Sequence, residues 1–266
     1  MPIKLVAIDL DGTLLTSEKQ VHPRNVEAIA AATEAGMRVM LASGRLSTSV
    51  IKYAEPLGLT GPHICCNGAD VAMTSGEVLS HIELATAEVV KVVDFAQANG
   101  IQINVYLQDQ VMFLERTEWT DWYLKRVPHL NPNFVNREAV LSASVSKVLL
   151  MDSPERIPGY RRELEAMLDP VFSRVTESEP QYLEILPPGV SKGAALERIA
   201  AGLGIAQSEV AAIGDYLNDF EMVEWAGFGG AMGDAAPSLK TIANLVVGTN
   251  DEGGVAEFLA AALALR

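Results

Sequence analysis

Cysteine and histidine are scarce in this chain of 266 residues, and their placement disfavours disulfides and zinc sites. The two cysteines, Cys65 and Cys66, are adjacent in an apolar stretch. Neighbouring residues rarely have disulfide geometry, and two sulfurs with no histidine nearby make a poor zinc site. The histidines lack the spacing of metal ligands; they are His22, His63, His81 and His129. We therefore expect two buried free thiols and a reducing compartment.

Long apolar runs are also missing, although 49% of the residues are hydrophobic. No run approaches the roughly 18–20 uninterrupted apolar residues that a membrane span requires. No basic segment and no cleavage signature precede the first predicted strand. We expect a cytoplasmic protein whose length permits a large core in one domain or in two.

Basic residues are outnumbered: 20 lysines and arginines face 34 aspartates and glutamates, which gives a net charge of −14. Such a charge disfavours nucleic acids and anionic membranes as partners. It also repels an anionic small molecule. A site for one therefore needs a local cation and a few basic side chains that invert the potential there. Nothing in the sequence indicates an oligomeric state.

Strands and helices alternate at both ends of the chain, which predicts a parallel α/β sheet with right-handed crossovers. Proline and glycine mark element ends, as at Pro23 in the first turn of a helix and Gly36 after it. The predicted strands span residues 3–8, 38–42, 63–66, 210–213, 227–231 and 245–247. The predicted helices span residues 23–35, 47–57 and 191–203, with a last helix after residue 254.

The middle of the chain, residues 82–187, has a different pattern. Hairpin-like strand pairs and intervening helices predict an inserted α+β domain there, and Pro187-Pro188-Gly189 marks the return. Residues 1–81 and 188–266 then form the α/β core. The predicted strands of the insertion span residues 101–106, 111–114, 146–151, 171–175 and 182–186. Its predicted helices run from residue 86 to about 100, over 118–127, and from about 158 to 168.

Acidic residues follow two of the predicted core strands. Asp9-Leu10-Asp11-Gly12-Thr13 comes directly after the first strand, and alternation aims Asp9 and Asp11 to the same side. Their like charges repel unless a cation or a shared proton lies between them. A second cluster, residues 214–219, follows the strand at 210–213. Both lie where α/β sheets bind ligands, so we expect an oxygen-ligand metal site suited to phosphate chemistry. A calcium loop is disfavoured because its glycine comes five residues after the first aspartate, not three.

In order along the chain, four segments resemble the four motifs of the haloacid dehalogenase (HAD) superfamily. They are Asp9-Leu10-Asp11-Gly12-Thr13, Ser43-Gly44-Arg45, Ser191-Lys192-Gly193, and Gly214-Asp215 with Asn218-Asp219. The long insertion between the second and third resembles the large cap of its Cof-type (subclass IIB) phosphatases. Asn67-Gly68-Ala69 and residues 188–193 are also similar to that subfamily. The resemblance implies a Rossmann-like core with an inserted α+β cap.

The resemblance also implies roles for the acidic residues. Asp9 is expected to be the nucleophile that forms an aspartyl-phosphate, and Asp11 the general acid and base. Magnesium is expected at Asp9, Asp215 and the backbone carbonyl of Asp11. Asp219 is expected to anchor a metal-bound water or Lys192, and Thr13 to support the metal site.

Further residues are expected at the phosphate and the leaving group. Ser43, the amide of Gly44, Lys192 and Asn218 are expected to bind the phosphoryl oxygens. Arg45 and Asn67 are expected to face the leaving group. Taken singly, Ser43 could instead cap a helix, Lys192 could be a solvated surface lysine, and Asp215 with residues 218–219 could cap a helix.

The expected activity is magnesium-dependent hydrolysis of a small phosphorylated metabolite, a sugar phosphate by the resemblance. Two alternatives stay open. A phosphosugar mutase of the same superfamily would pass the phosphoryl group to a sugar, and a regulator would bind a phosphometabolite without chemistry. Release of inorganic phosphate distinguishes the hydrolase from both.

Overall fold

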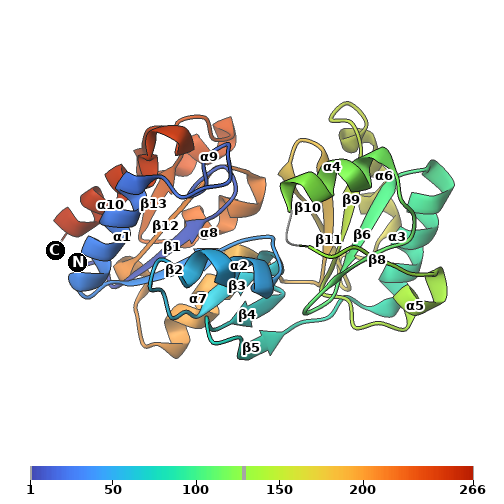
Figure 1. The fold of residues 1–266 in the computed structure, drawn as a ribbon, viewed down its shortest axis with the longest axis horizontal. Coiled ribbons are helices and arrows are strands. Elements are labelled where there is room, and N and C mark those ends of the chain that lie inside the picture. Colours follow the sequence, from blue (N-terminus) through green and yellow to red (C-terminus); the bar gives the residue numbers. More distant parts are fainter. Residues whose placement is uncertain (1, 128–129, 266) are drawn as a thin grey trace. The chain divides into compact units, whose positions relative to one another are not determined.

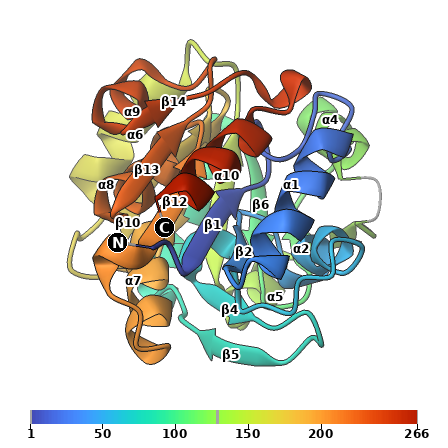
Figure 2. The same cartoon turned by 90° about the vertical axis from the view of Figure 1, so that its left-hand side faces the viewer.

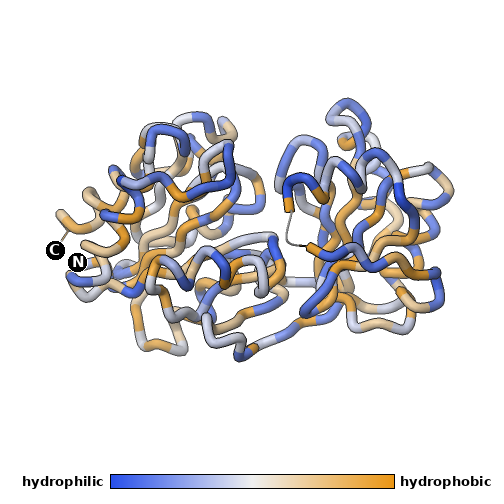
Figure 3. Tube along the Cα trace, in the orientation of Figure 1, coloured by the Kyte–Doolittle hydropathy of each residue, from blue (hydrophilic) through white to orange (hydrophobic). Residues whose placement is uncertain are grey.

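The computed structural model describes residues 2–127 and 130–265, which form two compact units (Figure 1). The first unit comprises the chain up to Leu79 and from Ser191 onward, and the second comprises Ser80–Val190. His129 lies outside the described residues. Figure 3 shows apolar residues concentrated along the inner strands of each unit, with hydrophilic residues at many loops and outer helix faces. Each unit therefore has a core of its own.

In the first unit, the sheet has the strand order β14-β13-β12-β1-β2-β3-β4-β5, parallel from β14 to β3. Its strands are β1 (Leu5–Asp9), β2 (Arg38–Ala42), β3 (His63–Cys65), β4 (Asp70–Ala72), β5 (Val78–His81), β12 (Val210–Gly214), β13 (Phe228–Ala231) and β14 (Leu245–Val246). Its helices are α1 (Pro23–Glu34), α2 (Ser47–Ala54), α7 (Lys192–Gly202), α8 (Phe220–Trp225), α9 (Pro237–Ile242) and α10 (Gly254–Ala264). The predicted parallel α/β core is thus confirmed.

Strand β1 lies in the middle of this sheet and is buried on both faces (Figure 2). Val6 and Ile8 pack in the cluster that includes residues of α1 and α10, whereas Leu5 and Ala7 pack in the cluster that includes residues of α7. This alternation explains the unbroken apolar run, because a parallel strand covered by helices on both faces needs apolar residues at every position. Strand β1 pairs with β2 on one side and β12 on the other, so the strands that precede both acidic segments are neighbours.

Three parts of the chain differ from the predicted elements. The strand predicted over residues 171–175 begins three residues too early: Phe172 and Ser173 donate their N–H groups to the carbonyl of Asp169 in a turn, and β10 (Arg174–Glu179) begins only at Arg174. Apolar β-formers indicated a strand there, but pairing with β11 sets its true position. The prediction also missed the short strands β4, β5 and β8 (Asn133–Phe134) and the short helices α5 (Arg137–Leu141), α8 and α9. Strand β4 pairs antiparallel with β3.

The second unit contains a sheet of order β10-β11-β9-β6-β7-β8. Its strands are β6 (Gln102–Tyr106), β7 (Val111–Phe113), β8 (Asn133–Phe134), β9 (Lys147–Met151), β10 (Arg174–Glu179) and β11 (Tyr182–Leu186). Its helices are α3 (Thr86–Asn99), α4 (Glu118–Arg126), α5 (Arg137–Leu141) and α6 (Ile157–Met167). Apolar residues of α3 and α6 pack on one face of the sheet, as expected of an α+β unit. None of the helices within the described ranges is long and apolar enough to cross a membrane.

The other face of this sheet carries buried polar groups. Lys147 on β9 and Glu184 on β11 are each 1% exposed and form an ion pair. The ammonium also lies 4.3 Å from the ring centroid of Tyr106, and Ser178 donates to the other oxygen of Glu184. The pair is therefore fully enclosed and satisfied by its neighbours.

This ion pair gives a prediction about stability. Lys147→Met leaves the Glu184 carboxylate buried without its cation and is expected to cost about 3–5 kcal/mol of unfolding free energy. The double variant Lys147→Met with Glu184→Leu removes both charges and is expected to recover most of that loss. Urea unfolding of the two variants and the parent measures both values. Equal destabilisation in the single and double variants would contradict the prediction.

Candidate active site

The carboxyl ends of two neighbouring strands bring three acidic side chains together. Asp9 is the last residue of β1, and Asp215 follows the last residue of β12. Asp9, Asp215 and Asp219 each offer one oxygen atom, and these atoms all lie within 4.8 Å of one another. Carboxylates from opposite ends of the sequence thus form one acidic group. The group could hold a metal ion.

The buried carboxylate of Asp9 has one oxygen in a hydrogen bond and one without. Oδ1 accepts a hydrogen bond from Nζ of Lys192 at 2.6 Å, whereas Oδ2 has no partner among the described residues. A buried acceptor without a partner needs a ligand or an ion to satisfy it. Lys192 also donates to Oδ1 of Asp219 at 2.6 Å, so one ammonium serves two carboxylates. This oxygen-rich, negatively charged group fits a hard divalent cation.

Burial and mutual repulsion raise the pKa values of two members of the group. The pKa of Asp9 is raised to about 7, first by burial and then by the charge of Asp219, against the opposing effect of Lys192. Burial and the charges of Asp9 and Asp219 also raise the pKa of Asp215 well above its ordinary value. Burial lowers the pKa of Lys192, but Asp219 and Asp9 outweigh it and raise that pKa overall. One lysine therefore does not compensate the three carboxylates, and a bound cation would.

Gly12 and Thr13, which follow Asp11 in the sequence, fix the position of the Asp215 carboxylate. Oγ1 of Thr13 donates to Oδ1 of Asp215 at 3.0 Å, which is compatible with the supporting role predicted for Thr13. Gly12 has a φ of +82°, which L side chains rarely adopt. A Cβ atom at Gly12 would lie 2.4 Å from Oδ2 of Asp215. Glycine is required here both by the backbone and by the carboxylate beside it.

Asp219 uses both of its oxygens within the protein. Oδ1 accepts from Lys192, and Oδ2 accepts from the backbone N–H groups of Asp215 at 3.0 Å and Tyr216 at 3.3 Å. Its side chain is 1% exposed. This arrangement is compatible with the predicted anchoring of Lys192, a role that stays a prediction.

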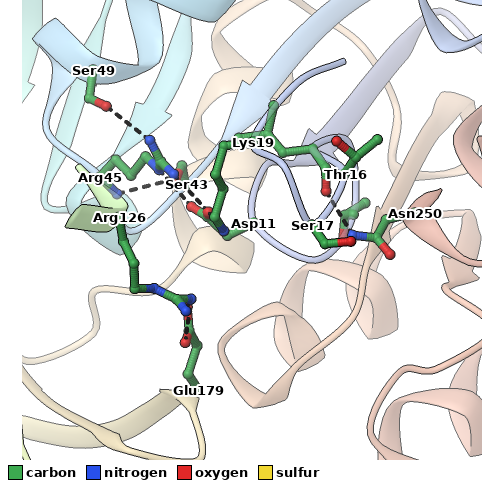
Figure 4. A network of polar contacts seen from close by, with 12 residues as sticks. Asp11, Thr16, Ser17, Lys19, Ser43, Arg45, Ser49, Arg126, Glu179 and Asn250 are labelled. Atoms are coloured by element: carbon green, nitrogen blue, oxygen red, sulfur yellow. Dashed lines mark hydrogen bonds and ion pairs between the residues drawn. The ribbon is translucent and has the colours of Figure 1, made fainter. Parts of the chain in front are cut away.

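The carboxylate of Asp11 pairs with cations (Figure 4). Arg45 donates from Nε to Oδ2 at 2.6 Å and from Nη2 to Oδ1 at 2.7 Å, and Lys19 donates from Nζ to Oδ1 at 2.7 Å. Burial alone would raise the pKa of Asp11, but Arg45 and Lys19 outweigh it and hold that pKa well below its usual range. Asp11 is thus ionised in this arrangement, and its predicted proton transfer requires its carboxylate to separate from both cations.

The remaining predicted residues are buried near the ends of β2, β3 and β12. Ser43 follows β2, is 1% exposed, and accepts a hydrogen bond from the N–H of Arg45 at 3.2 Å. Asn67 follows β3 with a left-handed φ of +56°, and its Oδ1 accepts from Nδ2 of Asn218 at 3.0 Å. The structure thus pairs two residues predicted for different roles. Their contacts with phosphate and leaving group stay predictions.

The contact of Lys19 with Asp11 was not predicted from the sequence. Lys19 lies in the loop between β1 and α1 and has a φ of +60°, which is uncommon for a residue with a side chain. A single lysine in a polar loop gives no pattern that distinguishes it from a solvated one. Only the folded loop shows that its ammonium reaches Asp11.

Comparison with known proteins gives the family to which the chain belongs. The sequence profile of the haloacid dehalogenase-like hydrolases matches residues 6–259, so the chain belongs to that family. It is 33% identical to the putative phosphatase YxeH of Bacillus subtilis over 95% of this chain and 96% of that one. It is 28% identical to the pyridoxal phosphate phosphatase YbhA of Escherichia coli K12, with 97% and 98% covered. The chain is accordingly an enzyme of the phosphatase class.

A solved structure shows the same fold. The HAD subclass IIB sugar phosphatase BT4131 superimposes with a TM-score of 0.87 at 22% identity, over 97% of this chain and 98% of that one. This likeness concerns the fold, whereas the profile match and the relatives confirm the predicted family.

The raised pKa of Asp9 gives a prediction about stability in metal-free protein. A carboxyl whose pKa rises from 3.8 to about 7 on folding lowers stability progressively between those pH values, with the full cost above pH 7. Asp9→Asn should therefore raise the unfolding free energy at pH 8 by about 1–3 kcal/mol, and by much less near pH 4. Urea unfolding in EDTA at both pH values measures this.

Asp11→Asn is the matched control, for which the expected change in unfolding free energy at pH 8 has the opposite sign. Because the pKa of Asp11 is held below its usual range, its carboxylate stabilises the fold above pH 4 and loses this effect only in acid. The variant should be less stable than the parent at pH 8. A gain for Asp9→Asn that is equal at the two pH values would contradict the assigned cause.

Gly12 gives a second prediction. Gly12→Ala should lower kcat about 100-fold, because the new Cβ displaces the carboxylate of Asp215. Gly36→Ala is the control: Gly36 has a φ of +89°, and a Cβ there meets nothing within 4 Å in the described parts of the chain. Gly36→Ala therefore introduces similar backbone strain without contacting the active site. Steady-state hydrolysis of a phosphate monoester measures both variants, and equal losses of activity would show that backbone strain alone is responsible.

Proposed function

We propose that the protein is a magnesium-dependent phosphatase that hydrolyses a small phosphorylated metabolite through an aspartyl-phosphate on Asp9. The observation that carries the proposal is the acidic group of Asp9, Asp215 and Asp219. One oxygen of Asp9 has no hydrogen-bond partner in the described parts of the chain, and Lys192 donates to both Asp9 and Asp219. Carboxylate oxygens in excess of positive charge favour magnesium over softer metals.

Asp9 is the proposed nucleophile. Lys192 holds its Oδ1, which fixes the carboxylate plane and leaves Oδ2 without a competing hydrogen bond among the described residues. In the first step a carboxylate oxygen of Asp9 bonds to phosphorus as the ester P–O bond breaks. In the second step a water oxygen displaces Asp9 and inorganic phosphate leaves. Asp9, Asp215 and the backbone carbonyl of Asp11 would hold the magnesium ion, which when bound shields the phosphoryl charge from the attacking carboxylate.

Asp11 is the proposed proton carrier. It gives a proton to the leaving oxygen in the first step and takes one from water in the second. Arg45 and Lys19 hold Asp11 ionised in the structure. The carboxylate of Asp11 must therefore separate from both cations before it carries a proton. Ser43, the amide of Gly44, Lys192 and Asn218 are proposed to bind the phosphoryl oxygens, with Arg45 and Asn67 at the leaving group.

We propose a sugar phosphate as the first substrate class to test, and residues 82–187 as the cap domain of the enzyme. The relative YbhA is named for pyridoxal phosphate, another small phosphorylated metabolite. Cys65 and Cys66 are buried and form no disulfide among the described residues, which suits a cytoplasmic enzyme.

The proposal predicts metal-dependent phosphate release that requires Asp9. Purified protein should release phosphate from members of a panel of sugar phosphates and other phosphometabolites, lose this activity in EDTA, and regain it with magnesium. Asp9→Asn should lower kcat on the order of 10⁴-fold or more because the nucleophile is lost.

Asp94→Asn serves as the control, because Asp94 forms an exposed ion pair with Arg137 in the second unit. It should keep the parent activity. Full activity in Asp9→Asn would remove Asp9 from its role. Conversion of a hexose 1-phosphate to the 6-phosphate without phosphate release would favour a mutase instead.

A further inference from the structure

Asp11 lies between two cationic side chains that reach it from different elements (Figure 4). Arg45 forms a two-pronged pair with its carboxylate, and Lys19 adds a third hydrogen bond at 2.7 Å. The side chains of Asp11 and Lys19 are each 27% exposed and that of Arg45 is 12% exposed, so the trio borders solvent. One arginine already neutralises one carboxylate. Lys19 therefore leaves one positive charge uncompensated within the trio.

Arg45 is held in place by contacts other than Asp11. Its Nη1 donates to Oγ of Ser49 at 3.3 Å, and its guanidinium carbon lies 5.4 Å from the ring centroid of Tyr53. Both contacts come from α2. The guanidinium fork therefore stays oriented toward this place when its carboxylate partner changes.

Lys19 is held through the backbone of its loop. The backbone N–H of Ser17 donates to Oδ1 of Asp251 at 2.8 Å, and Nδ2 of Asn250 donates to the carbonyl of Leu15 at 2.8 Å. A segment near the end of the chain thus fixes the loop in which Lys19 adopts its left-handed φ of +60°. An uncommon conformation that is held by surrounding contacts is typical of functional positions.

We infer that Arg45 and Lys19 bind a second anionic group of the substrate, a carboxylate or a further phosphate on the part that leaves. The inference rests on the proposed function and narrows its substrate class to phosphate monoesters whose alcohol carries another negative charge. Guanidinium pairs with carboxylate and phosphate in the same bidentate geometry, so the substrate anion can take the place that Asp11 occupies. Binding then separates Asp11 from its cations.

The same cations could instead serve the phosphoryl group that is transferred. The structure favours the second anion for two reasons. Lys192, which contacts Asp9 and is 1% exposed, already supplies a buried positive charge beside the proposed nucleophile. Arg45 and Lys19 contact Asp11, the residue proposed at the leaving oxygen, and are reached from solvent.

The test compares substrates that differ only in a second anion. The pairs are glycerate 3-phosphate with glycerol 3-phosphate, and fructose 1,6-bisphosphate with fructose 6-phosphate. Wild-type kcat/KM should be at least about tenfold higher for the more anionic member of one pair or both, and the pair with the larger ratio tells carboxylate from phosphate. Lys19→Met should reduce this ratio about tenfold, mainly through KM, and Lys19→Arg should retain most of it.

Lys4→Met is the matched control. Lys4 precedes β1, at the opposite end of that strand from Asp9, and forms an ion pair with Glu209 at 2.7 Å. Lys4→Met removes one positive charge, as Lys19→Met does, and should leave the substrate ratio unchanged. A thermal unfolding curve for each variant verifies folding, and Lys19→Arg provides a second probe of the same position.

The outcomes separate this inference from the proposed function. A wild-type ratio near one in both pairs overturns the second-anion site, as does an equal loss for both members of a pair in Lys19→Met. Magnesium-dependent hydrolysis of p-nitrophenyl phosphate, which has no second anion, keeps the phosphatase proposal standing in either case. Absence of magnesium-dependent hydrolysis of every compound overturns both.

Discussion

Repulsion among Asp9, Asp215 and Asp219 is the constraint on which the site depends. These carboxylates converge at the edge of a sheet with Lys192 between two of them, and burial keeps water from screening them. The fold tolerates this because paired strands hold Asp9 and the start of the second acidic segment in place, and because the N–H groups of residues 215 and 216 bind Asp219. This repulsion lowers the stability of the folded protein, and a bound cation would offset that loss.

Much of the core and of the acidic group could be predicted from the sequence. Strand β1 is buried on both faces, so its apolar run has no polar interruption, and the aspartate that ends it is conspicuous. Alternation of strands and helices predicts a parallel sheet, and the pairing of β1 with β12 in the structure brings Asp9 to Asp215. Such contacts are predictable because the direction of each strand fixes the edge of the sheet at which its last side chain lies.

Other contacts could not be predicted, for physical reasons. Lys19 and Arg45 are long, flexible side chains, and which carboxylate they reach depends on loop conformation rather than on residue type. The pairing of Asn67 with Asn218 depends on the left-handed turn after β3. The start of β10 was misplaced because an exposed Val171 and Phe172 have the composition of a strand but form a turn.

The position of β1 also has a consequence for biosynthesis. Strand β1 is an inner strand of the sheet, and its partner β12 is made some 200 residues later. Until then one edge of β1 stays open, and Asp9 has neither Asp215 nor Lys192 beside it. Ser80–Val190, in contrast, form a compact unit from contiguous chain. Synthesis therefore completes the acidic group of Asp9, Asp215 and Asp219 only after the whole of the second unit has been made.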